Sequence, residues 1–187
     1  NFVTTTLLNA IKQDRIGQGY IFTGPRGVGK TTTARILAMA LNSGEKPSDS
    51  YNPNSTTALE IAGGRSLDVL EIDGASNRGI EEIRNLREQI KFAPMESKFK
   101  IIIIDEIHML LGSSGKNSAD LLKPALARGL RLIGATTASE YRKYIKTDRA
   151  FERRFQVVDV SEPSVDETVT ILRGLREKYE AFHGVRI

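Results

Sequence analysis

The residues best suited to chemistry form a run of glycines that ends in a lysine and two threonines. The run is Gly24, Pro25, Arg26, Gly27, Val28, Gly29, Lys30, Thr31 and Thr32. Its spacing fits G-x-x-x-x-G-K-[ST] between an apolar run and a helix-forming run, which is typical of a phosphate-binding loop. Glycines let backbone N–H groups curl around a phosphate, and the N-terminus of the following helix adds a positive dipole. Lys30 would reach the β- and γ-phosphates of a nucleotide, and Thr31 would supply a hydroxyl to Mg²⁺. The alternative is a glycine-rich turn that binds nothing.

A second group of candidate residues follows an apolar run of four isoleucines at 101–104, where Asp105 and Glu106 come next. A strand buried in a parallel sheet delivers such acids to its carboxyl end. Asp105 can hold Mg²⁺ through water, and Glu106 can orient and polarise an attacking water. The alternative is a strand that ends in two solvated acids.

Three more residues are candidates for a role in phosphate chemistry. Thr137 follows the next apolar strand and can hydrogen-bond a γ-phosphate or the attacking water. Arg153 and Arg154 can act as a finger that reaches the γ-phosphate of a neighbouring subunit. The ordinary alternatives are a strand-terminal threonine without a ligand and a solvated arginine pair. His108 is interpreted as a packed or exposed histidine rather than a catalyst.

The elements that must position these residues alternate between strands and helices. Strands are expected at 20–23, 67–73, 99–104, 130–135 and 156–160, and helices at 1–14, from the loop to about 41, at 80–90 and at 119–128. A polar excursion over 42–66 holds a short helix near 56–62, and 110–117 is expected to be a loop. Ser164 and Glu167 form a capping box that starts a final helix. This alternation predicts an α/β fold with one parallel sheet covered on both faces.

Length and composition restrict the class of protein. The 187 residues suffice for one domain, and the net charge of +4 permits nucleic acid without arguing for it. There are no cysteines and two histidines, so no zinc site is expected. No apolar run approaches the roughly 20 residues of a membrane-spanning helix, and no leader opens the chain. A cytoplasmic protein without a membrane partner is therefore expected.

Together these residues resemble an AAA+ ATPase core, and the resemblance involves two families. Residues from about 1 to 109 resemble the gamma/tau clamp-loader subunit of bacterial DNA polymerase III, in the stretches from Gly19 through the phosphate-binding loop, at 64–69 and at 72–79. Residues from about 104 to 187 resemble the first ATPase domain of ClpB-type disaggregases, at 105–110, 122–129, 134–137, 141–144 and 152–187. Because the change of family lies on one strand, we interpret the chain as an engineered chimera, a recombined or designed object.

The resemblance implies a single nucleotide-binding subdomain over 1–187. The expected sheet has five strands in the order 5-1-4-3-2, with helices on both faces and no C-terminal lid, which would leave part of the adenine pocket absent. The clamp-loader family has a four-cysteine zinc site, and the corresponding positions are Ser43, Asn52, Ser55 and Ala58. The resemblance therefore implies ATP or ADP and Mg²⁺ as cofactors and no zinc.

Three functions remain open. The first is ATP or ADP binding with latent Mg²⁺-dependent hydrolysis, expected to be weak in isolation, with homo-oligomers formed through Arg153 and Arg154. The second is a recombined scaffold that binds nucleotide weakly or not at all and remodels nothing. The third is a DNA-associated clamp-loader ATPase. DNA or unfolded protein enters as a partner only by family resemblance.

Overall fold

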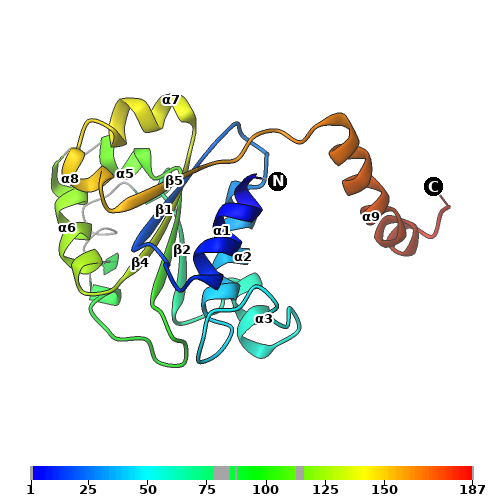
Figure 1. The fold of residues 1–187 in the computed structure, drawn as a ribbon, viewed down its shortest axis with the longest axis horizontal. Coiled ribbons are helices and arrows are strands. Elements are labelled where there is room, and N and C mark those ends of the chain that lie inside the picture. Colours follow the sequence, from blue (N-terminus) through cyan, green and yellow to red (C-terminus); the bar gives the residue numbers. More distant parts are fainter. Residues whose placement is uncertain (1, 78–84, 87, 113–115, 187) are drawn as a thin grey trace.

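Five parallel strands form one sheet at the centre of the chain, in the order β2-β3-β4-β1-β5 (Figure 1). The computed structural model describes residues 2–77, 85–86, 88–112 and 116–186. The strands are β1 (Gly19–Thr23), β2 (Val69–Asp73), β3 (Ile101–Asp105), β4 (Arg131–Thr136) and β5 (Phe155–Asp159). The predicted strand order is confirmed. It places β4 between β1 and β3, so the carboxyl ends of these three strands lie side by side.

The isoleucine run of β3 explains why the sheet is covered on both faces. Successive side chains of a strand point to opposite faces, and all four isoleucines are at most 1% exposed. Ile101 and Ile103 pack in the cluster that contains Phe22 and Leu37, whereas Ile102 and Ile104 pack in the cluster that contains Leu126. The strand therefore has no solvated side, as its continuous apolar sequence predicts.

Helices cover each face of this sheet. The helices are α1 (Phe2–Lys12), α2 (Lys30–Leu41), α3 (Thr56–Ala62), α5 (His108–Gly112), α6 (Lys116–Ala127), α7 (Ala138–Glu140), the π-helix η1 (Tyr141–Ile145), α8 (Arg149–Glu152) and α9 (Val165–His183). In Figure 1, α1, α2 and α3 lie on one side of the sheet, and α5, α6, α7 and α8 lie on the other.

Two of the expected elements, the loop at 110–117 and the helix over 80–90, are not confirmed. The loop expected at 110–117 is wrong in its described part, because α5 runs to Gly112 and α6 begins at Lys116. The helix expected over 80–90 falls mostly outside the described residues. The three short helices α7, η1 and α8 occupy a stretch in which the sequence analysis predicted no element.

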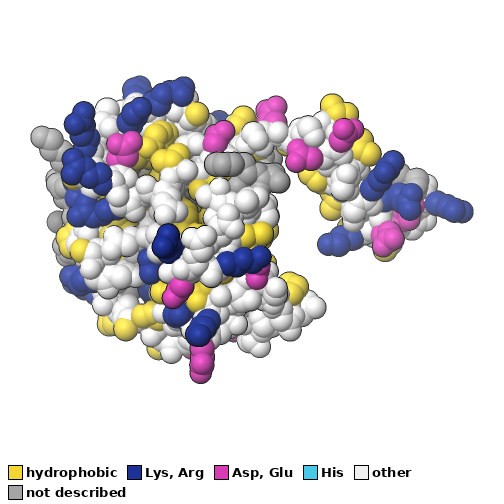
Figure 2. Space-filling view, in the orientation of Figure 1, with side chains coloured by type: hydrophobic (Ala, Val, Ile, Leu, Met, Phe, Trp, Pro, Cys, Tyr) yellow, Lys and Arg dark blue, Asp and Glu magenta, His cyan; other side chains and the backbone are white. Residues whose placement is uncertain are grey.

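The last helix, α9, stands away from the rest of the chain on an extended segment after β5 (Figure 1). Its capping box is formed as predicted, with Glu167 N–H donating to Ser164 Oγ and Ser164 N–H donating to Glu167 Oε2. None of its described residues is buried, and Val165 and Phe182 are 80% and 84% exposed. Figure 2 shows hydrophobic side chains on this helix beside clustered charges. Among the described residues, no helix combines the length and apolarity that a membrane crossing requires.

Candidate functional site

The phosphate-binding loop joins the carboxyl end of β1 to the N-terminus of α2, and two of its glycines are required by geometry. Gly29 has φ +89°, a left-handed conformation that strains any residue with a Cβ. Gly24 lies against the backbone, so that a Cβ would stand 2.1 Å from the Val160 oxygen. The N-cap residue of α2 is Gly29, which has no side chain and therefore forms no capping hydrogen bond. The positive end of this helix thus faces the loop without a bond from its own N-cap side chain.

Lys30 is folded back over the same loop. Its ammonium group donates to the carbonyl oxygens of Gly24, at 3.0 Å, and Pro25, at 2.6 Å, and the residue is only 9% exposed. These bonds satisfy a buried cation. They also hold the charge at the loop that surrounds the predicted phosphate position.

Thr31 and Asp105, the two predicted metal ligands, are 74 residues apart in sequence but adjacent in space. The Thr31 hydroxyl donates to Asp105 Oδ2 at 2.9 Å. They line a pocket of about 380 Å³. The other residues that line this pocket are Arg26, Gly27, Gly29, Lys30, Thr32 and Glu106. The structure thus brings six of the nine predicted loop residues and both acids to one concavity, whereas Gly24, Pro25 and Val28 do not line it.

Glu106 sits at the edge of this pocket in an unusual backbone conformation. Its φ is +47°, which few residues other than glycine adopt and which is found at functional sites. Oε1 lies 3.5 Å from Nε of the exposed Arg26, whereas Oε2 is buried without a hydrogen-bond partner among the described residues. One carboxylate oxygen is therefore left with unused accepting capacity.

The other predicted site residues lie outside the lining of this pocket. Thr137 directly follows β4, but its hydroxyl donates to Glu140 Oε2 at 2.7 Å and also caps α7. Arg153 is exposed at the C-terminal end of α8. Arg154 donates to the carbonyl oxygen of Ala150. The roles given to Thr137, Arg153 and Arg154 stay predictions.

Sequence reasoning missed a cluster beside Glu106. His108, 4% exposed, places Nδ1 2.9 Å from Thr136 Oγ1 and Nε2 3.1 Å from Glu140 Oε1. Burial opposes ionisation of Glu140, but the hydroxyl bond from Thr137 and the nearby His108 and Arg26 lower the pKa of this carboxyl below its ordinary value. The available signal was the position of His108 two residues after Glu106. Nothing in the sequence pointed to Glu140.

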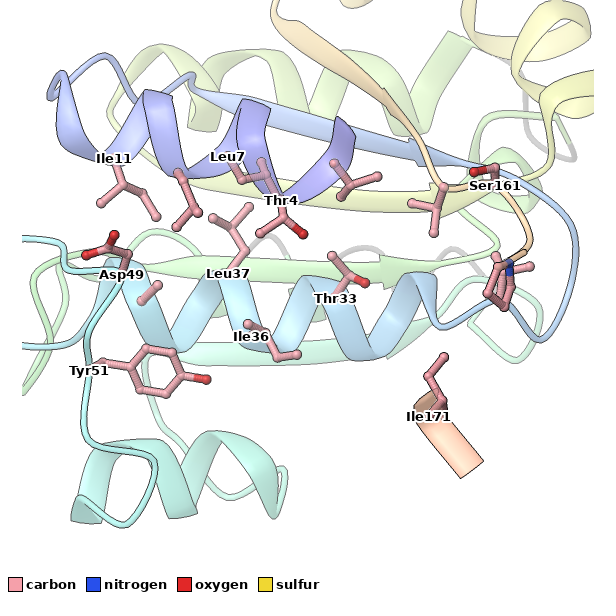
Figure 3. Close-up of a pocket in the computed structure, with 16 residues that line it drawn as sticks. Thr4, Leu7, Ile11, Thr33, Ile36, Leu37, Asp49, Tyr51, Ser161 and Ile171 are labelled. Atoms are coloured by element: carbon pink, nitrogen blue, oxygen red, sulfur yellow. The ribbon is translucent and has the colours of Figure 1, made fainter. Parts of the chain in front are cut away.

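An apolar groove of about 330 Å³ lies on the other side of the loop, between α1 and α2 (Figure 3). Leu7 of α1 and Leu37 of α2 face this groove, and Val28 joins it to the phosphate-binding loop. Pro163, which precedes α9, and Ile171 of α9 also line it. Most of the lining residues are apolar, and Thr4, Thr33, Asp49, Tyr51 and Ser161 add polar groups, so the groove suits a largely apolar group with some polar atoms.

Comparison with known families gives two matches. Residues 1–124 match the family described as "DNA polymerase III, delta subunit". Residues 164–187 match the family described as "AAA lid domain". The expectation of no C-terminal lid is therefore wrong, because α9 lies within the lid match and contributes Ile171 to the groove.

Curated and solved relatives of the chain include ClpB and Hsp104. The chain is 48% identical over 173 residues to "Chaperone protein ClpB" of Chlamydia pneumoniae, which covers 88% of this chain and 18% of that protein. It is 33% identical to the "S. cerevisiae Hsp104-ADP complex", with a TM-score of 0.66, covering 99% of this chain and 25% of that one. A second structure, the "S. cerevisiae Hsp104:casein complex", is 32% identical with a TM-score of 0.58. The chain spans about a fifth of the length of the curated relative. The 88% overlap with ClpB crosses the predicted family change at 104–109, and the chimeric origin stays a hypothesis.

Proposed function

The chain belongs to the family of the DNA polymerase III delta subunit and is an AAA+ domain related to ClpB and Hsp104, and on this premise we propose that it binds ATP or ADP and hydrolyses ATP slowly with Mg²⁺. The observation that carries this proposal is the 2.9 Å hydrogen bond between Thr31 and Asp105 in a pocket lined by the phosphate-binding loop. It joins a loop that can cradle phosphates to a carboxylate from a different strand.

The donor set at this point suits magnesium. A threonine hydroxyl and a carboxylate are hard oxygen ligands, and Mg²⁺ is usually held by one or two such groups, waters and substrate phosphates. Thr31 and Asp105 would hold the ion, directly or through water, and the ion would neutralise negative charge on the phosphates.

The chain's own residues divide the remaining work. Backbone N–H groups of the loop and the N-terminus of α2 bind phosphate oxygens. Lys30 leaves its loop carbonyls and reaches the phosphates as a point charge. Glu106 accepts a hydrogen bond from the attacking water through the otherwise unpartnered Oε2. It takes up the water proton as the water oxygen bonds to the γ-phosphorus and the bond from that phosphorus to the β–γ bridging oxygen breaks, which releases ADP. General-base groups of this kind contribute about 10²–10⁴ in rate.

We place the base of the nucleotide in the apolar groove. Support comes from the continuity of the groove with the loop through Val28 and from its apolar lining. Ile171 extends this lining from α9, where we expected part of the adenine pocket to be absent. Ile171→Ala should weaken ATP and GTP alike if the groove supplies only apolar contact.

Titration with a fluorescent ATP analogue, with and without Mg²⁺, tests the proposal. Lys30→Ala should abolish binding, because it removes the cation nearest the phosphates. Lys46→Ala removes an exposed lysine of the 42–66 excursion and serves as the matched control. Equal affinity of Lys30→Ala and Lys46→Ala would reject the assignment, and absence of binding by every variant would favour the scaffold alternative.

The macromolecular partner has two candidates, each favoured by one comparison. The delta-subunit match favours a DNA-associated ATPase. The identity to ClpB and the casein complex of the solved relative favour unfolded polypeptide. Stimulation of ATP hydrolysis by primed DNA but not by casein, or the reverse, separates them.

A further inference from the structure

The cluster around the buried His108 contributes no residue to the lining of the pocket of Thr31 and Asp105, yet it joins Glu106 to residues of β4, α7 and η1. His108 begins α5, Thr136 ends β4, Glu140 ends α7, and Tyr144 of η1 stacks on the ring at 5.9 Å between centroids. One ligand atom from each of Glu106, His108 and Glu140 lies within 4.8 Å of the others. Such a fixed imidazole is able to control the carboxylate beside it.

Hydrogen-bond chemistry determines where the ring carries its proton. An ionised carboxylate only accepts, so the 3.1 Å contact with Glu140 requires a proton on His108 Nε2. Burial opposes the charge on Glu140, but the hydrogen bonds from Thr137 and the nearby Arg26 lower the pKa of this carboxyl, which keeps it an acceptor. In a neutral ring, Nδ1 is then an acceptor, and the Thr136 hydroxyl donates a hydrogen bond to it at 2.9 Å.

This arrangement has a consequence for Glu106. Its Oε2 lies 3.5 Å from His108 Nδ1 and has no hydrogen-bond partner among the described residues. A ring with its proton on Nε2 donates nothing to this oxygen from Nδ1, and Nδ1 also accepts the hydrogen bond of the Thr136 hydroxyl. Glu106 is thereby kept free to accept from another donor.

We propose that His108 is a positioning residue for Glu106, and that Glu140 fixes the ring so that neither His108 nor Thr136 donates to the Glu106 carboxylate. The inference rests on the proposed role of Glu106 toward the attacking water. If the ring turns or is removed, a buried donor becomes available to the unpartnered oxygen, and the carboxylate is engaged before water reaches it. The fixed His108 ring therefore affects the chemical step and leaves nucleotide binding unchanged.

Kinetics of three variants test the proposal, with kcat, KM and the affinity for a fluorescent ADP analogue measured in parallel. His108→Ala releases the Thr136 hydroxyl and should lower kcat about tenfold or more, with KM and affinity within about twofold. His108→Asn places a carbonyl acceptor near the position of Nδ1 and should restore kcat to within about threefold. Glu140→Ala should resemble His108→Ala, whereas Glu162→Gln, an exposed carboxylate, should match the unsubstituted chain.

The result that overturns the proposal is an unchanged kcat in His108→Ala, or His108→Asn as slow as His108→Ala. A parallel loss of kcat, affinity and thermal stability would also overturn it, because that pattern indicates a purely structural role.

Imidazole ¹⁵N NMR at pH 8 gives a readout that needs no nucleotide. His108 should carry its proton on Nε2, and this preference should be lost in Glu140→Ala. The exposed His183 is the internal control. A proton on Nδ1 of His108 overturns the proposal. If the chain binds no nucleotide, the proposed function is rejected. The NMR measurement of the His108 tautomer then tests by itself whether Glu140 fixes the ring.

Discussion

At the scale of single residues, a bound phosphate dictates which residue types stand at which positions of the phosphate-binding loop. The loop glycines, Lys30 and Thr31 could be predicted because phosphate binding demands them in one local order. Asp105 could be predicted because an isoleucine run ends at it. His108 and Glu140 could not, because their contact joins α5 to α7 and depends on how β4 ends.

Thr31 gives a prediction at this scale. Thr31→Val keeps the branched shape but loses the hydroxyl that bonds Asp105 at 2.9 Å. Binding of the ATP analogue should then lose its dependence on Mg²⁺, while binding without Mg²⁺ changes by less than about threefold. Thr31→Ser retains the hydroxyl and should keep the Mg²⁺ dependence. An unaltered Mg²⁺ response in Thr31→Val would remove Thr31 from the proposed ion site.

At the scale of elements, periodicity and caps predict helices and strands whose stability is local, but they fail where tertiary contacts decide. The capping box at Ser164 and the buried run of β3 are of the first kind. The π-helix η1 is of the second, because Tyr141 donates to Glu152 Oε1 and Tyr144 stacks on His108. These partners lie outside the segment, so its own residues carry no signal.

Asp68 ties a loop to the sheet and gives a prediction with a pH dependence. It is 1% exposed and accepts the backbone N–H groups of Met95, Glu96 and Ser97 at 2.9, 2.8 and 2.8 Å. Burial alone would raise the pKa of Asp68, but these three bonds, with Lys100, lower it below its ordinary value. The stabilisation is therefore present above the unfolded pKa of about 3.9 and is lost as the pH falls through the lower folded value.

Asp68→Asn should lower the free energy of unfolding at pH 7 by about 1–3 kcal/mol, because the amide offers one acceptor oxygen in place of two. The difference from the unsubstituted chain should shrink as the pH falls below about 4. Urea unfolding at a series of pH values measures both. Asp14→Asn, an exposed control, should change stability by less than about 0.5 kcal/mol. A difference that persists at the lowest pH would contradict the role of the charge.

The final helix gives a second prediction about an element. Because α9 buries none of its described residues, its helicity depends on the cap and on local pairs. Ser164→Ala should destabilise α9 by about 0.5–2 kcal/mol, seen as faster amide hydrogen exchange in 168–183 with no change in β3. Ser164→Asp retains a capping acceptor and should exchange normally. Faster exchange that extends to β3, or unchanged exchange in α9, would show that tertiary contacts hold the helix.

At the scale of the whole molecule, the sheet order follows from the requirement that strand ends meet at one site. The order was predicted from family resemblance, since the residues alone indicate only alternating strands and helices. The position of α9 could not be predicted, because none of its described side chains is buried and only Ile171 lines the groove between α1 and α2. The arginine pair also belongs to this scale, because neither Arg153 nor Arg154 lines the pocket of Thr31 and Asp105 in its own chain.

The exposed Arg153 is therefore predicted to act on the site of a second copy. An arginine finger contributes about 10³–10⁵ in rate, so a monomer that lacks it hydrolyses ATP slowly. Turnover per chain should rise with protein concentration, and Arg153→Ala should remain slow at every concentration, whereas Arg15→Ala, an exposed control, should behave normally.

Mixing two inactive variants separates a finger that acts between copies from one that acts within its own chain. Glu106→Gln keeps Arg153 but lacks the base, and Arg153→Ala keeps the base but lacks the finger. If Arg153 acts in trans, the mixture contains sites that hold both groups, and turnover should exceed the sum of the separate variants. No gain on mixing, together with turnover that is independent of concentration, would show that Arg153 has no trans role, and the pair would then be a solvated feature of the α8–β5 junction.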